Sequence, residues 1–211
     1  MTKQAVILFV CAYFLGAIPF GFIIGKLVRK IDIRNYGSGN IGATNVLRVL
    51  GPFWGSVSFL FDVLKGFIPT YVASRMGMGA WIVILAGAIA VFGHTFSVFL
   101  RFKGGKGVAS SLGVIFGFNY SIALLGLLVF VIVLAATRYV SVSSCLATLS
   151  VFIMTLFWQW PPSHLAYKLV VGLLLLAIIV KHSSNFKRLA NGTENKFGQK
   201  ARINNSQGDG Q

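Results

Sequence analysis

The chain has 211 residues, of which 56% are hydrophobic and 11% are charged, and its formal net charge is +15. Such an apolar composition is typical of an integral membrane protein and excludes an ordinary soluble domain of this length. Nineteen Lys and Arg stand against four Asp and Glu, but these cations punctuate apolar runs instead of coating one soluble face, so we expect no nucleic-acid partner.

Apolar runs follow one another along most of the chain, and a helix needs about 20 apolar residues to cross a bilayer's hydrocarbon core. The runs are 5–26, 53–74, 80–100, 108–137, 140–158 and 164–181. The fourth is too long for one span, and Gly117, Asn119 and Tyr120 offer a turn, so we expect helices at 108–118 and 121–137. The predicted fold class is an all-α integral membrane protein with seven transmembrane helices, or six if the fourth run is one tilted helix.

The distribution of cations favours seven spans. Cytoplasmic loops carry the excess of Lys and Arg, and with seven spans most of the nineteen cations fall on one side, together with the carboxyl terminus. We therefore expect the amino terminus outside and the carboxyl terminus in the cytoplasm. Residues 1–197 are predicted to form one membrane domain, and 198–211 a polar, disordered cytoplasmic tail.

The first cytoplasmic loop reads RNYGSGNIGATNVLR, residues 34–48. Its glycines let backbone N–H groups converge on an anion, and a helix starting near Ala43 would aim its positive end at the same place. The alternative is a flexible surface loop, which would not explain an arginine on the first turns of the next helix. The hydrogen-bonding side chains of this loop are Ser38, Asn40, Thr44, Asn45 and Arg48.

The second cytoplasmic loop, FKGGKGVASS at 102–111, does not fit the phosphate-loop pattern of nucleotide-binding proteins. That pattern requires Gly five residues before Gly105 and Ser or Thr after Lys106, whereas Leu100 and Gly107 occupy those positions. Adjacent glycines and two lysines before a helix starting near Val108 still predict an anion site. Attraction of the lysines to lipid headgroups is the alternative, but it leaves the glycines unexplained.

The third stretch, KHSSNFKRLANGTEN at 181–195, places His182, Asn185 and Arg188 on one helical face. Within a span, Asp62 and Lys65 are three residues apart, and we favour an ion pair that orients the inner face of the site. His94 has no partner at recognisable spacing and is interpreted as structural.

No group of Asp, Glu, His or Cys has the spacing of a metal site, and no serine-nucleophile motif is present, so we expect no cofactor. Three glycine-and-cation loops on one membrane face suit a site for two phosphate-bearing substrates. Two other classes of protein stay open at this point, a transporter of organic phosphates and a structural or headgroup-binding membrane protein. No internal repeat supports the transporter.

Four ordered motifs resemble the bacterial acyl-phosphate:glycerol-3-phosphate acyltransferase family, over about residues 5–197. They are S-G-N-I-G-A-T-N at 38–45 with an arginine at 48, D-x-x-K-G at 62–66, K-G-G-K-G-V-A at 103–109 and H-x-x-N-x-x-R-L-x-x-G-x-E at 182–194. The resemblance implies a seven-helix enzyme of the bacterial inner membrane. It implies transfer of an acyl group from acyl phosphate to the 1-hydroxyl of glycerol 3-phosphate, the first step of phospholipid synthesis, with the donor made by a separate soluble enzyme from acyl-carrier-protein thioester.

The predicted site has three groups of residues. The resemblance carries catalytic and phosphate-binding roles over to Ser38, Arg48, Lys106, His182 and Asn185. Residues expected to bind substrate are Asn40, Thr44, Asn45, Lys103, Gly104, Gly105, Gly107 and Arg188. Residues expected to orient the site or hold the structure are Asp62, Lys65 and Glu194.

The chemistry of these residue types fits the implied reaction. An acyl phosphate is a mixed anhydride with a good leaving group, so the protein has mainly to position a hydroxyl and neutralise charge. Arg48 would donate two hydrogen bonds to a phosphate, and Lys106 would attract a phosphate as a single positive charge. His182 is one candidate base, but a substrate phosphate is favoured because His182 has no visible carboxylate partner. The acyl chain is expected to lie between helices, open to lipid.

Overall fold

A computed structural model describes residues 2–157, 164–199 and 201. Within them the chain forms ten α-helices and two short 3₁₀ helices, and no strand is present, so the all-α fold class is confirmed. The α-helices are α1 (Lys3–Ala17), α2 (Phe20–Arg29), α3 (Ala43–Leu50), α4 (Pro52–Arg75), α5 (Ala80–Thr95), α6 (Val108–Phe118), α7 (Tyr120–Thr137), α8 (Val140–Phe157), α9 (His164–Lys181) and α10 (Ser183–Ala190). The 3₁₀ helices are η1 (Ile33–Asn35) and η2 (Val98–Leu100).

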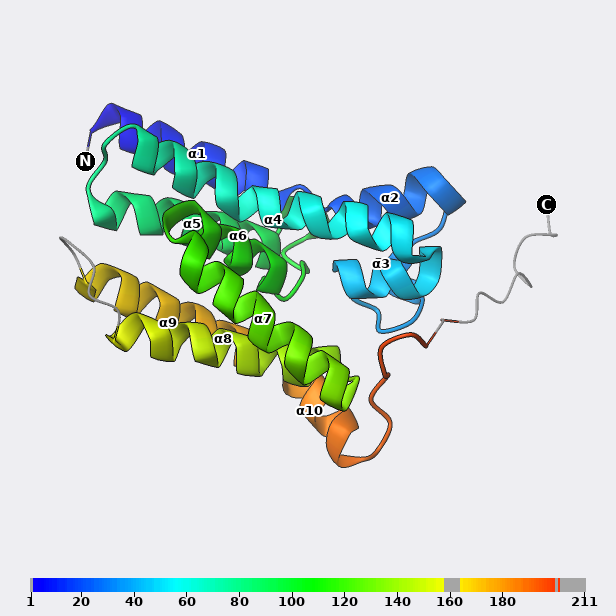
Figure 1. Ribbon diagram of the computed structural model, residues 1–211. Coiled ribbons are helices and arrows are strands. Elements are labelled where there is room, and N and C mark those ends of the chain that lie inside the picture. The colour runs from blue at the N-terminus through cyan, green and yellow to red at the C-terminus, as the bar shows by residue number, and fades with distance from the viewer. Residues whose placement is uncertain (1, 158–163, 200, 202–211) are drawn as a thin grey trace.

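The long helices run side by side as an elongated bundle, and α2, α3 and α10 gather at one of its ends (Figure 1). Helix α4 packs against α6, α5 and α3, while α1 packs against α5 and α7 against α8. Helices α4 and α6 approach closely because each presents a glycine to the other. A Cβ at Gly66 would lie 2.0 Å from the Ser110 carbonyl oxygen, and one at Gly113 would lie 1.9 Å from that of Val63. This contact fixes where the amino-terminal end of α6 lies.

Five stretches are long and apolar enough to cross a membrane, and a sixth is α9 if its bent continuation into α10 is counted. Helix α6 has only 11 residues, so the predicted count of seven spans is not confirmed. The predicted split of the fourth apolar run is confirmed, with α6 ending at Phe118 and α7 beginning at Tyr120. The outward faces of the bundle carry large exposed apolar side chains, such as Leu27, Leu128 and Leu173, as expected for surfaces that contact lipid.

The first apolar run forms one candidate span, Lys3–Arg29, as predicted, but its helix is interrupted. It breaks between α1 and α2 at Ile18 and Pro19, because proline has no N–H to donate and its ring disfavours helical backbone in the preceding residue. Of the predicted tail, Gly198, Gln199 and Ala201 are described, and the other residues of 198–211 lie outside the described part of the chain. The Ala201 N–H donates to the Arg48 carbonyl at 3.1 Å, so the beginning of this segment contacts the helical body.

Candidate active site

A polar pocket opens at the end of the bundle that holds α2, α3 and α10. It contains about 1270 Å³ of empty space, including its open mouth. Several segments far apart in sequence meet there, namely the loop before α3, the start of α6, the start of α8 and the region around α10. Predicted site residues that line it are Ser38, Asn40, Thr44, Asn45, Arg48, Asp62, Lys106, Gly107, His182, Asn185 and Glu194.

Asn45 organises the loop that carries Ser38. Its side-chain amide donates to the carbonyls of Ile33, Tyr36 and Asn40 at 2.9–3.0 Å, and its Oδ1 accepts from the Ser38 N–H at 2.8 Å. The side chain is 1% exposed. Although Asn45 was predicted to bind substrate, its hydrogen-bonding groups are occupied by the protein backbone, so it acts on the site by shaping this loop.

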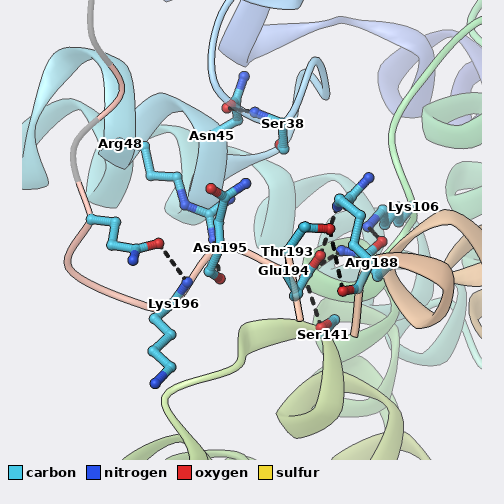
Figure 2. A network of polar contacts seen from close by, with 12 residues as sticks. Ser38, Asn45, Arg48, Lys106, Ser141, Arg188, Thr193, Glu194, Asn195 and Lys196 are labelled. Carbon is cyan, nitrogen blue, oxygen red and sulfur yellow. Dashed lines mark hydrogen bonds and ion pairs between the residues drawn. The ribbon is translucent and has the colours of Figure 1, made fainter. Parts of the chain in front are cut away.

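Arg48 lies in the last turn of α3, on the wall opposite Lys106 (Figure 2). Its Nη2 donates to the Asn195 carbonyl at 3.2 Å, while its Nε has no partner among the described residues although it is buried. Burial lowers the pKa of its guanidinium, and the nearby Glu194 partly offsets that effect. A buried guanidinium with an unused donor is well suited to receive an anionic oxygen.

The loop of 103–107 does not form the predicted cradle of glycine N–H groups. The N–H groups of Gly104 and Gly105 donate to the carbonyls of Thr95 and His94, at 3.1 and 3.0 Å. These acceptors belong to the last turn of α5, whose carbonyls lack helical partners. The glycines are needed for close approach, since a Cβ at Gly104 would lie 2.0 Å from the His94 oxygen.

Lys106 and Gly107 are the members of this loop that line the pocket, and Gly107 has a φ of +81°, which favours glycine. Helix α6 begins at the next residue, so its first N–H groups have no helical acceptor and lie at the pocket wall, with the positive end of the helix dipole. Lys103 was predicted to bind substrate, but it is exposed and does not line the pocket.

A continuous chain of contacts links Lys106 to Glu194 (Figure 2). The Lys106 ammonium donates to Asn185 Oδ1, and Asn185 Nδ2 donates to Glu194 Oε1 at 2.6 Å. Ser141 Oγ donates to the same oxygen at 3.0 Å, and Arg188 Nε donates to Oε2 at 2.8 Å. Arg188 therefore acts on the site through Glu194 and is not itself among the residues that line the pocket.

Burial and hydrogen bonding determine the charges of Lys106 and Glu194. Burial lowers the pKa of Lys106 to about 8, and the Glu194 carboxylate opposes the shift. Burial alone would raise the pKa of Glu194, but hydrogen bonds from Asn185, Arg188 and Ser141 outweigh it and the pKa lies below its ordinary value. At neutral pH the Lys106 ammonium group is thus linked through Asn185 to the ionised Glu194 carboxylate.

His182 lies between α9 and α10 and is 3% exposed. Its Nδ1 is 2.8 Å from the Ile178 carbonyl oxygen. Because a carbonyl only accepts, Nδ1 carries a proton, and in the neutral ring Nε2 is the nitrogen with a free lone pair. Among the described residues, no carboxylate forms an ion pair with this ring.

Beneath the pocket, Asp62 and Lys65 form the predicted ion pair, with 2.8 Å between Lys65 Nζ and Asp62 Oδ1. His94 joins them, because its Nδ1 lies 3.2 Å from Lys65 Nζ. The sequence showed no partner for His94 since this contact spans 29 residues. The backbone of the same histidine accepts from Gly105, so the buried pair supports the loop that carries Lys106.

Two serines of α8 were missed by the sequence analysis. Ser141 binds Glu194, and Ser144 is buried at the pocket wall. The one available signal was the run SVSSC at 141–145 inside an otherwise apolar span. Within the described part of the chain, no three His, Cys, Asp or Glu side chains gather in a way that could hold a metal ion.

Comparison with known proteins places this chain in a family. The family described as Glycerol-3-phosphate acyltransferase matches residues 6–192. The glycerol-3-phosphate acyltransferase of Aquifex aeolicus is 44% identical, over 92% of this chain and 100% of its own length. That of Acholeplasma laidlawii is 42% identical, over 92% and 94%.

Two crystal structures of PlsY, an integral membrane glycerol 3-phosphate acyltransferase, have the same fold. The glycerol 3-phosphate form is 42% identical with a TM-score of 0.88 and covers 93% of this chain and 96% of the solved one. The lysophosphatidic acid form is 40% identical with a TM-score of 0.85 and covers 93% and 97%. Helical fold, apolar spans and sequence agree, and the chain belongs to the integral membrane glycerol-3-phosphate acyltransferase family.

Proposed function

We propose that the protein transfers a fatty acyl group from acyl phosphate to the 1-hydroxyl of glycerol 3-phosphate, releasing lysophosphatidic acid and inorganic phosphate. The observation that carries the proposal is the polar pocket with Arg48 and Lys106 on its walls, which continues into an apolar chamber. The relatives' names supply the acceptor, since they are glycerol-3-phosphate acyltransferases. The acyl-phosphate donor and the position acylated are what the motif resemblance implies, and the chemistry of the site supports the donor.

An acyl phosphate suits a pocket of this kind because phosphate is already a good leaving group. The described residues contain no Ser or Cys paired with a histidine and a carboxylate, the arrangement of an acyl-enzyme mechanism. Arg48 and Lys106 neutralise the two phosphates, and the first N–H groups of α6 add to the positive field. The bound hydroxyl can then attack the acyl phosphate carbonyl directly. This step requires correct positioning and no acyl-enzyme intermediate.

The base that accepts the hydroxyl proton is proposed to be a substrate phosphate. His182 donates from Nδ1 to a backbone carbonyl and has no carboxylate to stabilise a charged ring, which supports a positioning role for its Nε2. Ser38, Asn40 and Thr44 remain candidates for contacts to the glycerol hydroxyls, because all three line the pocket.

The proposed cellular location follows from the apolar spans and the distribution of cations. We place the protein in the bacterial inner membrane, with the amino terminus outside, the carboxyl terminus in the cytoplasm and the pocket at the cytoplasmic surface. The cations near the pocket, Arg48, Lys106 and Arg188, agree with a cytoplasmic location. A separate soluble enzyme that converts acyl-carrier-protein thioester to acyl phosphate is the proposed source of the donor.

A phosphate-release assay tests the proposal. Purified protein given glycerol 3-phosphate and acyl phosphate should release phosphate without added metal or nucleotide, and the lipid product should be acylated at position 1. Turnover with acyl thioester alone would overturn the proposed donor. Lys106→Ala and Asn185→Ala should each lower the rate by about 100-fold or more, whereas Lys103→Ala, on the same loop but outside the pocket, should stay near the unsubstituted rate.

A further inference from the structure

An apolar chamber of about 640 Å³ of empty space, part of it open to the surroundings, adjoins the polar pocket. The two cavities share four lining residues, Phe59, Val108, Ala109 and Phe130. Among the described residues of the chamber wall only Ser111 and Thr148 are polar, and the Thr148 hydroxyl donates to the Ser144 carbonyl within its own helix. The chamber is therefore an apolar extension of the site.

Helix α7 shows the direction in which the chamber runs. Four of its residues, each four positions apart, lie near one face of the helix. Leu134 lines the polar pocket, Phe130 lines both cavities, and Gly126 lines only the chamber. Ile122, which follows in the same row, is fully buried in an apolar core cluster. At 1.5 Å per residue, the row from Leu134 to Ile122 is about 18 Å long.

Two neighbouring helices give the same order from mouth to end. On α8, Ser144 lines the polar pocket and Val151 lines the chamber. On α6, Val108 lines both cavities and Ile115 lines the chamber alone. Ile115 and Val151 belong to the buried cluster that includes Ile122. The chamber thus leads away from the phosphate-binding end. It stops at the buried cluster of Ile115, Ile122 and Val151, which we call the plug.

The depth of the chamber is determined where α7 meets α8. A Cβ placed on Gly126 would lie 2.5 Å from Val151 Cγ2, closer than side-chain carbon atoms approach each other. Gly126 is buried, and both residues line the chamber. The missing side chain at 126 and the valine opposite it together set how much space remains above the plug.

We propose that the chamber holds the acyl chain of the donor and that Gly126 and Val151 set the greatest chain length that the protein accepts. The inference rests on the proposed function, since it takes the ligand to be an unbranched fatty acyl chain whose activated carboxyl group lies in the polar pocket. The chamber is partly open to its surroundings, which agrees with an acyl chain lying between helices, and buried apolar residues close its far end. A chain longer than the chamber meets the plug, and the reacting carbonyl is held away from the acceptor hydroxyl.

The test is a series of saturated acyl phosphates of increasing length with glycerol 3-phosphate, in which kcat/KM is measured for each length. Gly126→Ala should lower kcat/KM about tenfold for the longest chain that the unsubstituted protein uses well, because one extra methylene in a fitted apolar pocket discriminates by roughly that factor. The shorter chains should be unaffected. Val151→Ala should extend the accepted range to longer chains.

The double variant Gly126→Ala with Val151→Ala adds one methyl group and removes two, so its length profile should return toward that of the unsubstituted protein. Leu128→Ala is the matched control, because Leu128 lies on the same helix but faces outward, 53% exposed, and its length profile should not move.

An unchanged length profile in both single variants would overturn the inference and would show that the chain lies elsewhere, for example in the surrounding lipid. A uniform loss at all lengths that the double variant does not repair would also overturn it and would assign the pair to packing alone. If the unsubstituted protein used acyl thioesters and not acyl phosphates, the proposed donor would fail. The same series made with thioesters would then support or overturn the length limit independently.

Discussion

Replacement of Glu194 tests the chain of contacts that holds Asn185 and, through it, Lys106. The Glu194 carboxylate accepts three hydrogen bonds, from Ser141, Asn185 and Arg188. In Glu194→Ala all three donors lose their acceptor, and the amide of Asn185 is left buried. Loss of one partner from a buried charged network costs about 3–5 kcal/mol. For a chain of this length, that free energy corresponds to a fall in apparent Tm of roughly 6–20 °C.

Glu194→Gln separates the carboxylate's charge from its hydrogen bonds. The glutamine oxygen can still accept from Ser141 and Asn185, while the contact to Arg188 is lost. A hydrogen bond to a charged group is worth about 1.5–3 kcal/mol, and the lower value applies here because the Arg188 side chain is 32% exposed and is screened by water. We therefore expect Glu194→Gln to cost about 1.5 kcal/mol, at most about half of the cost of Glu194→Ala.

In Glu194→Ala the reaction rate should fall by more than the loss of folding stability alone would cause. Without Glu194, Asn185 is no longer held against Lys106, and a displacement of about 1 Å in a positioning group lowers a rate by about 100-fold. Thermal unfolding in detergent and phosphate release would be measured on the same preparations. Asp32→Asn is the control, since Asp32 is partly exposed and pairs with the exposed Arg34, so this change should cost less than about 1 kcal/mol. Full activity and unchanged unfolding in Glu194→Ala would refute the role of the contact chain.

Two further predictions concern the loop of 103–107. Because burial lowers the pKa of Lys106 to about 8, its positive charge is present below that pH and lost above it. The KM for glycerol 3-phosphate should be constant below about pH 7 and rise about tenfold per pH unit above about pH 8. Lys106→Arg should remove this rise, because arginine keeps its charge. A KM that stays constant up to about pH 9.5 would contradict the role of the Lys106 charge in binding. Gly104→Ala would force a Cβ to 2.0 Å from a backbone oxygen and should lower the rate about 100-fold. The matched Gly79→Ala, with open space around it, should change stability by less than about 0.5 kcal/mol, and equal effects of the two changes would refute the close-approach argument.

The elements that the sequence predicts well are those fixed by local chemistry. The boundary between α6 and α7 was read from Gly117, Asn119 and Tyr120, and the Asn119 side chain indeed accepts from the Ile122 N–H at 2.9 Å. The starts of α3 and α6 were also predicted correctly. The number of spans was not settled in this way, because it depends on how a short helix and a bent pair lie relative to a bilayer.

The glycine loop shows where local reasoning fails. Its composition predicts N–H groups that are free for an anion, but Gly104 and Gly105 give theirs to the end of α5. Which carbonyls lie nearby is a property of the fold and leaves no mark on the loop's own sequence. The same holds for Asn45, whose amide faces backbone 5–12 residues away, and for Ser141, whose partner Glu194 is 53 residues distant.

Glu194 follows the last described helix in the chain, and this order has a consequence for biosynthesis. A ribosome delivers the amino-terminal helices first, at roughly 5–20 residues per second. Arg48, Lys106 and Ser141 are therefore all inserted before the residues that join them have been translated, and Glu194 and the Asn195 carbonyl complete the pocket last. A chain that ends between residues 190 and 194 would contain all the helices of the described residues, yet it would lack the carboxylate that holds the donors in place. Activity thus depends on translation that continues past residue 194.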